Sequence, residues 1–266
     1  MHIEVVQILV GQQRILDVTA PAGNAVQFRN EAQRIGDVLD HVGTDDIVEG
    51  AVVERKSPAV VTMNRLAAQI RRDYPEQSLV LVGFSLGAAA ALRVAPLLGA
   101  RVERIDLVSP AAPLALGDFL SGMAGAPVFR AAQAGRVPFA IVAWLQAQAA
   151  GLAAGRMASA LMARAAGEDR ALAGDPVFLG QLAASLRDSL LARRAAYRQE
   201  ILHYVSDRQE ELAKVDQPVT IWQGSEDNWT PPAMAHALAA ALPQAAIVQM
   251  LPGLSQFSAL RAYLEA

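Results

Sequence analysis

The sequence predicts an α/β fold in which a mostly parallel sheet is flanked by helices and interrupted by an inserted helical lobe. Three observations predict it: short β-branched apolar runs alternate with helical patterns, a central stretch has no strand-like run, and the alternation returns near the C-terminus. Strands joined through helices form parallel sheets, because the helix carries the chain back to the start of the next strand.

The elements follow in chain order. We expect strands at residues 3–10, 14–19, 47–53, 79–82 and 104–108, and helices at residues 26–39, 60–74 and 88–98. After the central stretch we expect a strand at 219–223, a helix at 232–242, a strand at 247–251 and a helix at 257–265. This divides the chain into a core, residues 1–112 and 214–266, and a helical lobe, residues 113–213.

Composition indicates the class of protein. Of 266 residues, 53% are hydrophobic and 18% are charged, which predicts a folded protein with a sizeable buried core. The net charge of −3 leaves no electrostatic footprint for nucleic acid or anionic lipid, so we expect neither as a partner. There is no cysteine and no cluster with metal-ligand spacing, so we expect no metal and no cofactor. The first residues do not resemble a signal peptide, which favours a cytoplasmic location.

The longest uncharged stretch, residues 137–155, approaches the length of a transmembrane span. It contains Pro138, Gln146 and Gln148 and is rich in Ala and Gly, whereas a span needs strongly apolar side chains. We therefore expect a packed helix of the lobe and no membrane span. The oligomeric state is left open by the sequence.

A G-x-S-x-G motif follows the apolar run at 79–82. It reads Gly83-Phe84-Ser85-Leu86-Gly87 and precedes an alanine-rich helix. The glycines leave room for a tight, strained turn that lifts a serine hydroxyl above the strand end, and the helix N-terminus offers backbone N–H groups to a developing oxyanion. Ser85 is then a candidate nucleophile, and Leu86 a candidate oxyanion donor. The alternative is a structural turn with a capping serine.

At this motif the sequence resembles the α/β-hydrolase family. Residues 220–231 are similar to the family's late strand, followed by a glycine, the triad acid and a proline, which makes Asp227 the implied acid. When the strands are counted as in the family, the lobe at residues 113–213 lies between the sixth and seventh strands. In this position it resembles the family's helical cap. Phe84, beside the nucleophile, is the implied substrate-binding residue.

The sequence departs from the family at two places. Residues 247–257 match the family's tail, except that Gln256 stands where the catalytic histidine belongs. Glutamine cannot take a proton from Ser85, so the triad is incomplete, and His203 in the lobe is the best substitute base. The family's His-Gly step is also missing. Pro21 has no N–H to donate, so Ala22 is the candidate for the second oxyanion donor.

These residues predict a serine hydrolase-like protein that acts on an ester or thioester of an apolar acyl group. Ser85 and Asp227 would carry the reaction, and Gln256 would mark either an inactivated variant or a divergent enzyme. Flexible apolar side chains at the start of the lobe, among them Phe119 and Met123, favour an apolar substrate. The alternative is a non-catalytic ligand-binding protein, or a non-hydrolytic enzyme, that keeps the fold.

Overall fold

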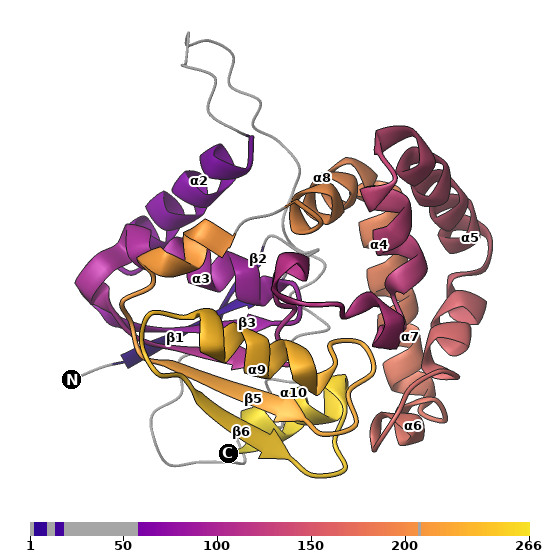
Figure 1. Cartoon of the computed structure of the whole chain (residues 1–266). Helices are drawn as coiled ribbons and strands as arrows, with labels where there is room; N and C mark the ends of the chain where they lie inside the picture. Colours follow the sequence, from indigo (N-terminus) through magenta and orange to yellow (C-terminus); the bar gives the residue numbers. More distant parts are fainter. Residues whose placement is uncertain (1–2, 10–13, 19–57, 207–208) are drawn as a thin grey trace, which may run out of the picture.

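A computed structural model describes residues 3–9, 14–18, 58–206 and 209–266 of the chain (Figure 1). The predicted helix at 26–39, the predicted strand at 47–53 and Ala22 lie outside the described residues. The described strands are β1 (Ile3–Leu9), β2 (Arg14–Val18), β3 (Ser78–Phe84), β4 (Val102–Val108), β5 (Val219–Gly224) and β6 (Ile247–Leu251). The described α-helices are α2 (Pro58–Asp73), α3 (Gly87–Leu98), α4 (Ala126–Gln133), α5 (Arg136–Met162), α6 (Asp169–Leu172), α7 (Pro176–Arg187), α8 (Arg194–Tyr204), α9 (Pro232–Ala241) and α10 (Gln256–Glu265).

Shorter helical turns complete the described part of the chain. They are η1 (Gly99–Arg101), η2 (Leu114–Leu116), η3 (Leu120–Gly122) and η5 (Gln209–Lys214), with a π-helical turn η4 (Asp188–Ala192) between α7 and α8. The predicted strands and helices from residue 58 onward agree with these elements within a few residues. β4, for example, begins two residues earlier than the predicted strand, and Val102 at its start is also buried.

The six described strands form one sheet in the order β2-β1-β3-β4-β5-β6. All neighbouring pairs are parallel except β1 and β2, which are antiparallel. The predicted, mostly parallel sheet is therefore confirmed, and β1 and β2 form its antiparallel pair. Only residues 10–13 separate the two strands, and so short a connection cannot carry the chain back to the other end of the sheet.

The two faces of the sheet are covered by different helices. Leu79 and Leu81 of β3 pack into the cluster that also contains α3 and α9, whereas Val80 and Val82 pack with residues of α10 on the other face. Successive side chains of a strand point to opposite faces, so a central strand covered on both sides is apolar at every position. This explains why the run at 79–82 shows no alternation of apolar and polar residues.

Between β4 and β5 the described residues form helical elements and no strand. Figure 1 shows these helices gathered to one side of the sheet, with α5 on the side of the lobe away from it. The uncharged stretch at 137–155 lies within α5, which bends at Ala153, where φ is −153° and ψ is 49°. Within the described residues, α5 is the helix long and apolar enough to cross a membrane, and 28% of its most apolar 18-residue window is buried.

Candidate active site

The G-x-S-x-G motif forms a strained turn between β3 and α3. Ser85 has a φ of +53°, in the left-handed region that residues with a side chain rarely adopt. Gly83 allows the turn to close, since a Cβ at this position would lie 2.7 Å from the Cα of Ala88. The strand, the turn and the helix are those that the sequence predicts, and the strained conformation is located at the predicted nucleophile.

Backbone hydrogen bonds hold the turn against the next strand. The Ser85 N–H donates to the Val108 carbonyl at 3.1 Å, and the Ala111 N–H donates to the Ser85 carbonyl at 3.0 Å. Within the described residues the Ser85 hydroxyl makes no hydrogen bond, and the Leu86 N–H makes none to the backbone. Among the described residues, neither group is taken up by one of these bonds, and the roles of Ser85 and Leu86 stay predictions.

Asp227 lies in the loop after β5, at the edge of the sheet where β3 also ends, because the two strands run parallel. Its carboxylate is almost fully buried, with 3% of the residue exposed. One oxygen accepts hydrogen bonds from the N–H groups of Trp229 and Thr230 at 2.8 and 3.0 Å, and the other accepts from the Thr230 hydroxyl at 2.9 Å. Burial raises the pKa of the Asp227 carboxyl above its ordinary value, although the backbone donors of Thr230 and Trp229 oppose the shift.

Gln256 is the first residue of α10 and follows β6 at the same edge of the sheet. Only 7% of the residue is exposed, and its amide oxygen has no hydrogen-bond partner among the described residues. The turn before it packs closely on the loop of Asp227, since a Cβ on Gly224 would lie 2.5 Å from the carbonyl oxygen of Leu254. A buried amide acceptor without a donor is an open position for a ligand, a water or a hydroxyl.

The lobe is bonded to both of these loops. Asp169 of α6 is fully buried and accepts hydrogen bonds from the N–H groups of Phe257 and Ser258 at 2.9 and 2.7 Å. The Glu168 N–H donates to the Gly253 carbonyl at 3.0 Å, and the Asn228 amide donates to the Arg164 carbonyl at 2.8 Å. A short part of the lobe, residues 164–169, therefore fixes the loop after β5 and the start of α10 in place.

Aromatic contacts join the predicted nucleophile to the base position. Phe84 is next to Ser85, and Phe257 is next to Gln256. The centroids of the two rings lie 6.0 Å apart. The ring of Phe257 lies 5.2 Å from Phe178 of the lobe. Phe84 therefore packs among aromatic side chains from the core and the lobe, and its predicted contact with a substrate stays a prediction.

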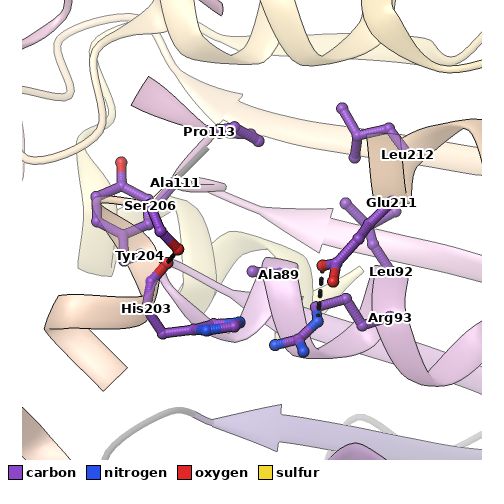
Figure 2. Close-up of a pocket in the computed structure, with 10 residues that line it drawn as sticks. All are labelled: Ala89, Leu92, Arg93, Ala111, Pro113, His203, Tyr204, Ser206, Glu211 and Leu212. Carbon is purple, nitrogen blue, oxygen red and sulfur yellow. Dashed lines mark hydrogen bonds and ion pairs between the residues drawn. The ribbon is translucent and has the colours of Figure 1, made fainter. Parts of the chain in front are cut away.

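Two of the four histidines, His203 and His236, lie in the described part of the chain. His236 is exposed on α9, and His2 and His41 lie outside the described residues. His203, at the end of α8, lines a small pocket together with Ala89 and Ala111. Figure 2 shows its ring directed toward Arg93, which is paired with Glu211 at 2.9 Å. His203 thus lies beside the first turns of α3, and its role as a substitute base stays a prediction.

Sequence reasoning missed the groups that surround the predicted residues. Thr230, three residues after Asp227, forms the turn that binds the acid, and an Asp followed by a Thr at this spacing is a signal for such a turn. Asp169 gave no signal, because its partners lie 88 and 89 residues away. Among the described residues, no group of three His, Cys, Asp or Glu side chains could hold a metal ion.

Comparison with known proteins identifies the family to which the chain is similar. The profile of the family described as serine aminopeptidase, S33, matches residues 48–254. An enol-lactonase from Burkholderia xenovorans LB400 is 17% identical, with a TM-score of 0.52 over 76% of this chain and 70% of the other. A bromoperoxidase from Bacillus anthracis is 14% identical, with a TM-score of 0.50 over 76% and 70%.

The Lip1 protein of Acinetobacter baumannii AYE is 13% identical, with a TM-score of 0.50 over 75% of this chain and 62% of the other. The chain therefore spans less than two thirds of the length of Lip1. At these identities the likeness shows a shared fold alone. A comparison with curated protein sequences finds no match.

Proposed function

Because the chain belongs to the serine aminopeptidase S33 family and has the α/β-hydrolase fold, we propose that it is a serine hydrolase-like protein for an apolar acyl ester or thioester. The observation that carries the proposal is the conformation of Ser85. A left-handed residue with a side chain costs about 1–3 kcal/mol, and such residues cluster at active sites and ligand clamps. A serine that only capped α3 would not need it.

The surroundings of Ser85 suit attack on a carbonyl carbon. The hydroxyl is not held by any described residue, and the Leu86 N–H, at the start of α3, can donate to the oxygen that becomes negative as the tetrahedral intermediate forms. Ala22, which lies outside the described residues, remains the candidate second donor. The aromatic and apolar side chains around Phe84 favour an apolar acyl group.

The weak point of the site is its base. A buried carboxylate such as Asp227 orients an imidazole and stabilises its charged form, but position 256 carries an amide that cannot accept the serine proton. We propose that turnover is impaired for this reason and that position 256 is the base site. In the absence of a histidine, the Asp227 carboxylate accepts hydrogen bonds from Trp229 and Thr230 of its own loop.

Four proteins test this proposal: the chain as it is, Gln256→His, Ser85→Ala and the double variant Ser85→Ala/Gln256→His. Each is measured with p-nitrophenyl esters over a range of acyl chain lengths. We expect Gln256→His to gain at least about 100-fold in kcat, the lower range of a general-base contribution, and the double variant to lose this gain. Gln256→His without any gain over all chain lengths would overturn the assignment of the base site.

A second function, the binding of a ligand without turnover or a non-hydrolytic reaction, is favoured by one observation. The Gln256 amide oxygen is buried and open, so it can accept a hydrogen bond from a ligand that carries an N–H or O–H group. If all four proteins are inert while the single and double variants stay folded, this second function becomes the better account.

A further inference from the structure

The outer face of α5 exposes an unusual row of large apolar side chains. Val137, Ile141, Trp144, Leu145 and Leu152 are 72%, 56%, 52%, 54% and 86% exposed. Successive members of the row are four, three, one and seven residues apart, which places all five within one side of the helix. With a rise of 1.5 Å per residue, the row is roughly 22 Å long. We call these five residues the apolar row.

The opposite side of α5 is already packed. It consists of small or buried residues at the same helical spacing: Phe139, Ala143, Ala147, Ala150, Ala154, Ala158 and Met162. Phe139 and Ala143 pack in a cluster with Ile201 of α8. α5 is therefore fixed to the lobe by one side, and the apolar row on its other side is exposed to solvent. Figure 1 shows that α5 itself lies on the side of the lobe away from the sheet.

The charged side chains on α5 itself are basic. Residues 136–162 contain no Asp or Glu, and their only charged side chains are Arg136 and Arg156, both exposed. A shallow hollow beside the row is lined by Arg136, Val137, Ala140, Ile141, Trp144 and Arg198. The Nε atom of Arg198 is buried and has no hydrogen-bond partner among the described residues. The hollow thus offers two guanidinium groups beside apolar side chains, which suits an anion that carries an apolar chain.

We propose that α5 docks the protein on an anionic lipid surface. The apolar row enters the boundary between headgroups and acyl chains, and Arg136 and Arg198 contact lipid phosphate. A helix that presents an apolar face with a tryptophan and arginines at its border has the character of an interfacial helix. The net charge of −3 belongs to the whole chain, whereas the charge that meets the lipid is the local one around α5.

Two other occupants fit less well. A transmembrane span would have to strip α5 from α8 and lose the packing of Phe139 and its neighbours. A second copy of the chain, packed α5 on α5, would meet a border that has arginines and no carboxylate on that helix. Like charges across a contact are unfavourable, whereas phosphate headgroups complement them.

Vesicle flotation tests the docking. The full chain is mixed with vesicles of phosphatidylcholine alone or with about 30% phosphatidylglycerol, which makes the vesicle surface anionic and attractive to basic segments. Ile141→Ser/Leu145→Ser removes part of the apolar row, and Ile247→Ser, an equally exposed apolar residue on β6, is its control. Arg136→Gln/Arg198→Gln removes the cations, and Arg65→Gln/Arg72→Gln on α2 is the matched control.

We expect the unchanged chain to float with the anionic vesicles. Its partition coefficient should fall at least about tenfold in Ile141→Ser/Leu145→Ser and about tenfold in the arginine variant, while both controls float like the unchanged chain. Circular dichroism shows that each variant is folded. Brominated lipid should quench the tryptophan fluorescence, and Trp144→Phe should remove this quenching.

Three results would overturn the proposal. The first is no flotation with either vesicle, and the second is equal flotation of the unchanged chain and Ile141→Ser/Leu145→Ser. The third is a dimer in light scattering that this variant abolishes, without vesicle binding, which assigns the apolar row to a second copy.

Discussion

The carboxylate of Asp169 accepts a 2.7 Å hydrogen bond from the backbone N–H of Ser258, and the two residues belong to different parts of the chain. Asp169 lies in the helical lobe, and Ser258 lies in the first turn of α10, two residues after Gln256. The first N–H groups of a helix lack partners within the helix, and a negative charge there also interacts favourably with the helix dipole. The lobe thus supplies the cap that fixes the position of residue 256.

Replacement of this cap should be costly. Asp169→Ala leaves the N–H groups of Phe257 and Ser258 unpaired in a buried place, so we expect a loss of about 2–3 kcal/mol in the free energy of unfolding. The control is Asp175→Ala, which removes the cap of α7. Asp175 accepts one of its two bonds from the exposed N–H of Val177, so this variant should lose only about 1 kcal/mol. Urea denaturation measures both. Equal losses in the two variants would contradict the role of Asp169.

Gly83 should not tolerate even a methyl group. In Gly83→Ala the new Cβ would lie 2.7 Å from the Cα and 3.0 Å from the N of Ala88, and a helix backbone cannot move aside as a flexible side chain can. We expect a loss of about 1–3 kcal/mol, the usual cost of overpacking. Gly180→Ala, in α7 with open space around it, should instead stabilise the protein by about 0.5–1 kcal/mol. Thermal unfolding compares them, and a Gly83→Ala variant as stable as the parent would refute this account of the turn.

The parts of the structure that the sequence predicts are those with local causes. Three neighbouring segments illustrate this: the apolar run at 79–82, the glycines around Ser85 and the alanine-rich segment after them. Each forms the strand, the turn or the helix that its own residues favour. The same holds for the loop of Asp227, where Gly224 permits the close approach of the next turn. The link at 10–13 has a local effect as well, because it is too short for a crossover and β1 and β2 therefore pair antiparallel.

The parts that it does not predict depend on contacts between distant residues. The bond from Asp169 to Ser258 spans 89 residues, and the bond from Tyr204 to Ala112 spans 92. Neither residue belongs to a local pattern, since α6 has four residues and Tyr204 is one of several aromatic residues in the lobe. Their partners follow only from the way in which the lobe packs on the core.

The ionisation of Asp227 should make stability depend on pH. Its pKa is raised in the folded protein by burial, so the folded state binds more protons than the unfolded state between the ordinary and the raised value. Stability therefore falls as pH rises through this window, and the cost remains at higher pH. We expect the free energy of unfolding of the parent, relative to Asp227→Asn, to increase as the pH is lowered from 7 to 4. Urea titrations at each pH measure the difference, and the opposite trend would show that the bonds to Trp229 and Thr230 outweigh burial.

Tyr204 should hold the lobe to the core. Its hydroxyl donates a 2.9 Å hydrogen bond to the carbonyl of Ala112, which is fully buried, and its ring packs on Phe129 at 5.0 Å. Tyr204→Phe keeps the ring and leaves a buried carbonyl unpaired, which costs about 1–3 kcal/mol.

The control for this variant is Tyr197→Phe. The Tyr197 hydroxyl donates to Gln146, whose half-buried amide can turn toward water, so the loss should be smaller, about 1 kcal/mol or less. Burial raises the pKa of both phenols, to about 12 for Tyr197, so both hydroxyls remain donors at neutral pH and the comparison does not depend on ionisation. Hydrogen exchange should show faster exchange in α8 for Tyr204→Phe than for Tyr197→Phe. Similar exchange in the two variants would mean that the lobe is held by apolar packing, without a measurable contribution from this hydrogen bond.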